Sequence, residues 1–340
     1  MYKKQNPPTE GCMRALKRVA GLLMLSASAI TVTAGAATPS GHYPVKPIRL
    51  IVPFAAGGPM DIMSRAIGEK MTASWGQQVV VDNRSGAGGR IGVEVAARSA
   101  PDGHTLLTGH IGTHAVNPSL YPKLEYDPVR DFAPISLIAT LPLGLFVHQS
   151  VNARTVVELL AVARQQPGRI NFATASSGGP THMAAEMLKS MASIQITHIP
   201  YKGNAAALNA VVAGESQMMF SNLLTGTPHV RSGRLRLLAI SSGKRSPQAP
   251  DLPTVAETGV TGYDFTPWYG MLSPAGTPAP IIARLHHEIV RIVESAEMKS
   301  RFISQGVDLI TSSPGDFAAL IRSEIPKWRK IVKDTGASVG

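Results

Sequence analysis

IVPFAAGGPMDIMSRA, the sequence of Ile51–Ala66, combines the marks of a strand, a turn and a helix. An apolar run stops at Pro53, two glycines and a second proline follow, and apolar residues then recur at helical spacing. This pattern predicts a buried strand, a tight turn and the start of a helix. Gly57 and Gly58 fit two interpretations: either they satisfy the geometry of the turn, because glycine adopts positive φ at little cost, or they let a ligand approach the backbone.

The sequence beyond this stretch also alternates between strand and helix patterns. Strands are predicted at 48–54, 77–83 and 104–110, with helical patterns between them. Such alternation predicts a parallel sheet, in which ligands bind beyond the carboxyl ends of the strands. Three loops, at 54–58, 83–89 and 108–113, are therefore expected to meet at one rim, and they contribute the candidate residues Phe54, Asn83 and Thr113.

A second αβ region is expected to begin near residue 142. The segment 169–192, RINFATASSGGPTHMAAEMLKSMA, repeats the order of strand, Gly-rich turn and helix. Further strands are predicted around 196–201, 216–222 and 234–242, and Tyr201 ends one of them. The fold class is thus expected to be α/β with two related halves.

The C-terminal part is predicted to be helical. Residues 277–306 are expected to form two helices, and another helix should begin at Ser313. Ser313 and Asp316 have the spacing of a capping box. Pro326 is expected to bend or end this last helix.

The N-terminal segment has the composition of a secretory signal. A basic stretch, Arg14–Arg18, precedes an apolar run of small residues at 19–37. We expect a signal peptide at 1–37, cleaved near Ala36 or Ala37, and a periplasmic mature protein. The alternative is a retained membrane anchor, which the Ser, Thr, Ala and Gly of the run disfavour. The true start could be Met1 or Met13.

Composition excludes several classes of protein. Hydrophobic residues make up 44% of the 340 residues and charged residues 16%, as in globular proteins. Cys12 precedes the apolar run, so cleavage leaves no thiol for a disulfide, a cysteine metal site or a cysteine nucleophile. Removing residues 1–36 lowers the net charge from +11 to about +7. The Lys and Arg residues are scattered, so no nucleic-acid partner is expected.

Two Gly-rich turns and one aromatic segment are candidates for the functional site. The turns at 54–61 and 176–183 each precede a helix N-terminus, which attracts anions. Neither turn carries a nucleotide-binding pattern. Ser177 and Thr181 could clamp a carboxylate. Trp268 lies in an extended segment, 263–276, and is either a cleft residue or a packing residue at a hinge.

No cofactor or metal is expected. His110 and His114 are four residues apart, but the metalloprotease pattern H-E-x-x-H does not occur. Ser177 with His182 could in principle serve an exported hydrolase, although the G-x-S-x-G pattern of a nucleophile elbow is missing.

The motifs taken together resemble the Bug-type extracytoplasmic solute receptors of tripartite tricarboxylate transporters. The resemblance runs from about Tyr43 to the C-terminus, and its motifs occur in the family's order. Those motifs are YPVKPIRLIVPFAAGGPMDIMSRAI, VDNRSGAGGRIG, APDGHTLL, HAVNPSLYPKLEYDPVRDFAPI, HIPYKG and LPTVAETG.

The resemblance implies a two-lobed periplasmic binding protein of type II, the Venus-flytrap architecture, with two hinge strands. Lobe 1 would comprise 42–141 and 270–340, and lobe 2 would comprise 142–269. The implied activity is capture of a small organic carboxylate for a membrane permease, without catalysis. A monomer is expected. A periplasmic sensor is an alternative role, and the effector domain of a transcription regulator is disfavoured because the signal segment occupies the place of a DNA-binding domain.

The resemblance also implies which residues hold the ligand. The two Gly-rich turns would grip one carboxylate from opposite lobes, largely through backbone N–H groups and water. The full set of expected ligand-binding residues is Phe54, Ala56, Gly57, Gly58, Asn83, Thr113, Ser177, Gly178, Thr181, His182, Tyr201, Ser221 and Trp268.

Ser221 marks a departure from that family's pattern. Many relatives carry Asp-Asn where this chain has Ser221-Asn222. A neutral serine, unlike an aspartate, does not repel a second anionic group on the ligand. We therefore expect a carboxylate without an amino group, as in a dicarboxylate or an aromatic acid, and the exact ligand stays open.

The export hypothesis is directly testable. N-terminal sequencing of the native protein, purified from the periplasmic fraction, should find a mature N-terminus close to Ala37. A native protein that still carries the residues before Met24 would rule out cleavage at this point.

Overall fold

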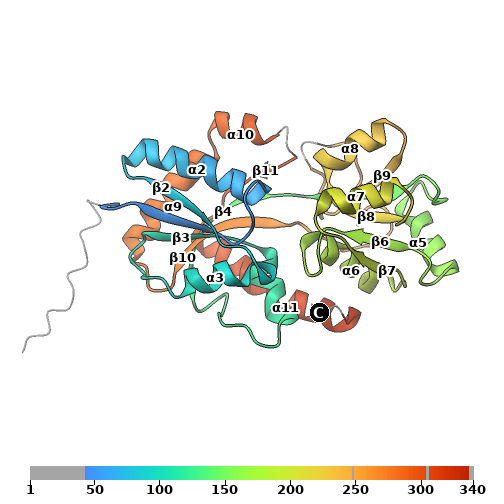
Figure 1. The fold of residues 1–340 in the computed structure, drawn as a ribbon, viewed down its shortest axis with the longest axis horizontal. Coiled ribbons are helices and arrows are strands. Elements are labelled where there is room, and N and C mark those ends of the chain that lie inside the picture. The colour runs from blue at the N-terminus through green and yellow to red at the C-terminus, as the bar shows by residue number, and fades with distance from the viewer. Residues whose placement is uncertain (1–42, 247–248, 304–305, 337–340) are drawn as a thin grey trace, which may run out of the picture. The chain divides into compact units, whose positions relative to one another are not determined.

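The computed structural model describes residues 43–246, 249–303 and 306–336, which form two β-sheets with helices packed on them (Figure 1). The expected signal peptide at 1–37, Cys12 and both candidate start positions lie outside the described residues. No described helix has the length and apolar character needed to cross a membrane. The predicted α/β class is confirmed.

The first sheet has six strands in the order β11-β4-β10-β3-β1-β2. β1 pairs in parallel with β2 and β3, as the alternation of strands and helices predicted. β10 runs antiparallel to β3 and β4. The strands are β1 (Ile48–Val52), β2 (Val79–Asn83), β3 (Thr105–His110), β4 (Phe132–Thr140), β10 (Trp268–Pro274) and β11 (Asp308–Leu309).

The helical elements around the first sheet come from both ends of the chain. They include a short 3₁₀ turn, η2, and a π-helical turn, η3. They are α2 (Pro59–Trp75), η2 (Ala87–Gly89), α3 (Arg90–Ala97), η3 (Gly112–Val116), α4 (Asn117–Leu120), α9 (Ala279–Val293), α10 (Ala296–Ile303) and α11 (Pro314–Thr335).

The second sheet has five strands in the order β7-β6-β8-β5-β9. β6 is parallel to β7 and β8, whereas β5 is antiparallel to β8 and β9. The elements of this half are β5 (Leu143–His148), α5 (Val156–Gln165), β6 (Asn171–Thr174), α6 (Pro180–Ala192), β7 (Thr197–Pro200), α7 (Asn204–Val212), β8 (Met218–Asn222), α8 (Leu223–Arg231) and β9 (Leu235–Ile240).

Two segments of chain cross between the sheets and are hydrogen-bonded to each other (Figure 1). The first connects β4 to β5, and the second connects β9 to β10. The Leu141 amide donates to the Pro267 carbonyl at 2.9 Å, and the Ser241 amide donates to the Leu143 carbonyl at 2.7 Å. The boundary expected between residues 269 and 270 falls inside β10.

Helix α11 packs against elements of both halves, including β4 of the first sheet and helix α6 of the second half. It begins as predicted, with the Ser313 hydroxyl accepting from the Asp316 amide at 3.0 Å. The helix does not end at Pro326, however, but continues to Thr335. Pro326 lies on the exposed side, while Trp328 beyond it is fully buried against the edge of Phe265, and this packing offsets the missing backbone hydrogen bond.

The crowded contact between β10 and α11 predicts a stability difference between two glycine variants. In Gly270→Ala the added Cβ would lie 2.5 Å from Cε1 of the buried Phe317 ring, so we expect a loss of about 1–3 kcal/mol. Gly315→Ala, in the first turn of α11, is the control, because the nearest atom there is the Ser313 hydroxyl at 3.8 Å. Urea unfolding of both variants measures the effect, and equal midpoints would contradict it.

Candidate functional site

The same turn precedes a helix in each half of the molecule. AAGGPMD (Ala55–Asp61) precedes α2, and SSGGPTH (Ser176–His182) precedes α6. In both turns the first glycine has positive φ, at 85° and 73°, and the second is extended, at −80° and −79°. The proline then takes the first helical position. Turn geometry alone therefore requires the first glycine of each pair but not the second.

In the first turn, one carboxylate holds the glycine in place. The Gly57 amide donates to Asp61 Oδ2 at 2.9 Å. Asn83 Nδ2 donates both to Asp61 Oδ1 and to the Phe54 carbonyl, each at 3.0 Å. Arg65 Nε also donates to Asp61, at 3.1 Å. Burial by itself would raise the pKa of Asp61, but the hydrogen bonds from Arg65, Gly57 and Asn83 hold it below its ordinary value.

In the second turn, a histidine accepts the hydrogen bond that the aspartate accepts in the first. The Gly178 amide donates to His182 Nδ1 at 2.9 Å, so the proton of the neutral ring is on Nε2. His182 Nε2 lies 3.4 Å from Glu186 Oε1, and Lys189 also pairs with Glu186, at 2.9 Å. The His182 ring is thus a support behind the turn.

A second histidine packs on that support. The ring of His198 stacks on His182, with centroids 3.9 Å apart. Its Nε2 lies 2.6 Å from Thr174 Oγ1. Burial, followed by the neighbouring His182, lowers the pKa of His198 to about 4. Thr181, on the same helix as His182, accepts from the Ala175 amide at 3.1 Å and also braces the turn.

A cavity of about 210 Å³ lies between the two halves, where residues of both meet. Three of the expected ligand-binding residues, Phe54, Ser177 and Gly178, are in its lining. Among the described residues, no Asp, Glu, Lys or Arg lines it. The first half contributes Phe54, Gly88, His110, Gly112, Asn117, Leu120 and Tyr121, and the second half contributes Ser176, Ser177, Gly178, Gly179 and Pro180.

Several expected residues surround this cavity without lining it. Ala56 and Gly57 are exposed and Gly58 is partly exposed, on the turn next to Phe54. Thr113 is buried behind His110, and its hydroxyl donates to the His110 carbonyl at 3.0 Å. These residues, with Asn83, Thr181 and His182, form the surroundings of the two turns.

The three remaining expected residues lie apart from the cavity lining. Tyr201 is partly buried, and its amide donates to the Thr174 carbonyl at 2.9 Å. Ser221 is fully buried on β8 and donates to Asn204 Oδ1 at 3.0 Å. Trp268 is only 3% exposed and packs edge-on against Phe317, with ring centroids 5.4 Å apart.

Gly88, His110 and Gly112 of the lining lie in loops that were expected at the rim, but none of them was expected as a ligand-binding residue. His110 was singled out only as one of a spaced pair of histidines. In the structure it ends β3 and stacks on Phe54, with centroids 4.7 Å apart. The π-helical turn η3 follows it, a feature found often at functional sites. The signal was present in the rim expected at 108–113, but a side chain's direction cannot be predicted from such a loop.

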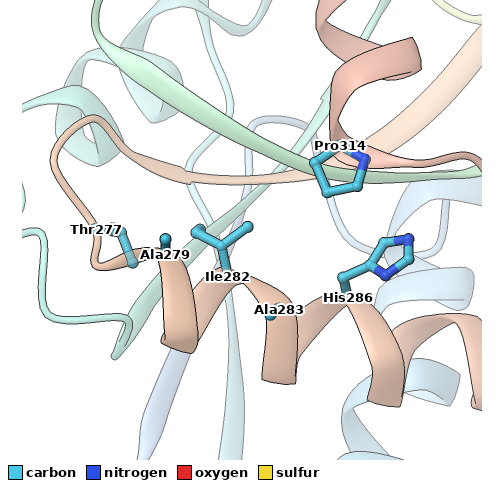
Figure 2. Close-up of a pocket in the computed structure, with 6 residues that line it drawn as sticks. All are labelled: Thr277, Ala279, Ile282, Ala283, His286 and Pro314. Carbon is cyan, nitrogen blue, oxygen red and sulfur yellow. The ribbon is translucent and has the colours of Figure 1, made fainter.

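A second hollow, of about 440 Å³, lies along α9 and is lined mainly by apolar atoms. Figure 2 shows Ile282 and His286 on one side of α9 and Pro314 opposite them. His286 Nε2 is already 3.0 Å from the Ser312 carbonyl, and the Thr277 hydroxyl donates to the Pro274 carbonyl. This hollow is lined from the first half alone, so the cavity lined from both halves is the better candidate.

The chemistry of that cavity suits a small anion. The α6 helix has thirteen residues, and its N-terminus lies at the turn that lines the cavity. Helix N-termini stabilise negative charge through the dipole and unpaired amides. Within the described part of the chain, no three His, Cys, Asp or Glu side chains gather where they could hold a metal ion.

Comparison with known proteins gives consistent matches. A family model described as the tripartite tricarboxylate transporter family receptor matches residues 63–337. The chain is 36% identical over 310 residues to Protein BugT of Bordetella pertussis, covering 90% of this chain and 95% of BugT.

Solved structures match as well. R. palustris Rpa4515 with adipate has a TM-score of 0.77 and 34% identity, covering 87% of this chain and all of that chain. MatC from Rhodopseudomonas palustris with bound malate has a TM-score of 0.73 and 32% identity, covering 85% and 100%. The predicted binding-protein fold is therefore confirmed.

The ionised Asp61 should stabilise the protein at neutral pH. Because its pKa is lowered in the folded state, this contribution is present above the unfolded value near pH 4 and is lost as the pH falls through the folded value. We expect Asp61→Asn to cost about 1–3 kcal/mol at pH 7 and much less near pH 3. The exposed Asp251→Asn is the control. Denaturant unfolding at pH 7 and at pH 3 measures the free-energy cost of Asp61→Asn. An equal cost at both pH values would contradict this expectation.

Proposed function

Because the chain belongs to the tripartite tricarboxylate transporter receptor family, we propose that it is a periplasmic solute-binding protein that holds a small carboxylate between its two lobes. The lobes are the first sheet and the second sheet with the helices packed on each. The single observation that carries the proposal is the cavity lined from both lobes by uncharged groups, with the Ser176–Pro180 turn and the α6 N-terminus at one wall.

The size of the cavity supports a small metabolite as the ligand. Its volume of about 210 Å³ is below the roughly 300–1,000 Å³ of sites for drug-sized ligands. Two related structures contain adipate and malate, which are both dicarboxylates. The Ser177 hydroxyl has no hydrogen-bond partner among the described residues, so it is available to such a ligand.

We propose roles of two kinds for five of the expected residues that lie outside the cavity lining. Ala56, Gly57 and Gly58 would meet the ligand through the backbone when the lobes close, because their turn adjoins Phe54 at the cavity. Thr181 and His182 would act indirectly by holding the second turn. Closure would be favoured because a ligand that contacts both lobes stabilises the closed state.

The geometry of His182 favours a receptor over a hydrolase. A general base must accept a proton from its nucleophile. His182 Nδ1 already accepts from the Gly178 amide, and Nε2 faces Glu186. Neither nitrogen is directed to take the proton of Ser177, so hydrolysis through this pair is disfavoured.

The family membership extends the proposal to location and partners. We propose export by the N-terminal signal segment and delivery of the carboxylate to the membrane permease of a tripartite transporter. The receptor would act as a monomer without a cofactor.

The neutral Ser221 predicts the ligand class. Ser221 is buried outside the cavity lining, so its neutrality acts on the ligand through the local charge and not through contact. In a thermal-shift assay, succinate should stabilise the protein more than aspartate, its 2-amino analogue, because no carboxylate at position 221 attracts an ammonium group. Ser221→Asp should reduce the preference for succinate. Ser232→Asp, on an exposed turn, adds the same charge as a control. A wild-type preference for aspartate, or an unchanged ranking in Ser221→Asp, would contradict the argument from charge.

A further inference from the structure

The ring of His110 is fixed at the wall of the cavity. It is the last residue of β3 and is only 6% exposed. One face stacks on Phe54, with centroids 4.7 Å apart and planes at 27°. The edge of Tyr269 lies against it at a centroid distance of 6.0 Å. These contacts leave the imidazole little freedom to turn.

A backbone hydrogen bond sets the position of the proton on that ring. His110 Nδ1 accepts from the Gly112 amide at 2.6 Å. A Cβ at position 112 would overlap the ring's Cε1, so this close approach requires glycine. Because Nδ1 is an acceptor, the neutral ring carries its proton on Nε2. Burial lowers the pKa of His110 to about 3, which keeps the ring neutral at physiological pH.

The Nε2–H group of His110 has no hydrogen-bond acceptor within the described part of the chain. Another side-chain N–H donor on this wall, Asn117 Nδ2, is already engaged with the Gly88 carbonyl at 3.2 Å. The opposite lobe presents Ser177 and the neighbouring turn, and apolar groups such as Leu120 and Pro180 complete the lining. The cavity therefore offers polar groups on both lobes and an apolar surface between them.

We infer that His110 is a specificity-determining residue whose Nε2–H donates to a second oxygen-bearing group of the ligand, while the first carboxylate lies at the Ser176–Pro180 turn. The inference rests on the proposed function and narrows it to linear acids with an acceptor at the far end, of which α,ω-dicarboxylates are the simplest. An ammonium group at that end is rejected, because it would face an N–H group.

The physical reason for selectivity is the cost of an unsatisfied donor. A ligand that ends in a methyl group displaces water from the N–H of His110 without replacing its hydrogen bond, whereas a terminal carboxylate accepts that hydrogen bond. Sites that hydrogen-bond a ligand group discriminate strongly against analogues that lack the group. Adipate and hexanoate form such a pair, since both have six carbons and only adipate has the second carboxylate.

Calorimetric titration with adipate and hexanoate tests the inference. The wild type should bind adipate at least tenfold more tightly than hexanoate. His110→Phe keeps a ring to stack on Phe54 but has no N–H, so it should lose at least tenfold in adipate affinity and keep its hexanoate affinity within about twofold. His110→Gln restores a donor and should recover part of the loss. His114→Phe, at a buried histidine of the same segment outside the lining, should keep the wild-type ratio.

The outcomes separate this inference from the proposed function. If the wild type binds adipate but His110→Phe weakens both acids equally, or neither, His110 only supports the fold and the inference is overturned. If the wild type binds neither acid nor any linear dicarboxylate of four to seven carbons but binds another small carboxylate such as benzoate, the inference fails and the proposed function stands. If it binds no small carboxylate, the proposed function fails as well. Circular dichroism of each variant confirms that the fold is retained, and His110→Gln gives the answer if His110→Phe does not fold.

Discussion

A glycine amide that donates to a side chain four residues farther along the chain shapes both walls of the site. Gly57 donates to Asp61 in lobe 1, and Gly178 donates to His182 in lobe 2. Each hydrogen bond joins a glycine with positive φ to the first turn of the helix that follows. The bond therefore holds the loop close to the helix N-terminus. The position of the cavity and its preference for an anion both depend on these two turns.

The charged side chains that support the two turns do not line the cavity. Asp61 is paired with Arg65, and Glu186 with Lys189, while the described cavity lining carries no charged side chain. A carboxylate is then bound by backbone dipoles, hydroxyl groups and a neutral imidazole. Such groups do not require a cation to be buried when the site is empty, which would be costly. They also leave the choice among carboxylates to the few donors that face the ligand.

The strand-turn-helix of 51–66 could be predicted because periodicity, the paired glycines and the proline are local signals. The role of His182 could not be predicted from the sequence, because its contact with Gly178 depends on how the turn folds back. The orientation of the His110 ring was harder to predict, because it depends on a close approach to Gly112 and on stacking with Phe54, which follows another strand. Helix α8 was missed because Gly226 and Pro228 interrupt its pattern, although Asn222 caps it.

The most direct test of the account is a crystal structure with the dicarboxylate that binds most tightly in calorimetry. The account predicts one molecule between the lobes, with one carboxylate within hydrogen-bond distance of the turn at Ser177–Gly179 and the opposite end of the ligand directed at lobe 1. Ligand density at another place, such as the hollow along α9, or a carboxylate held by Lys or Arg side chains, would contradict it.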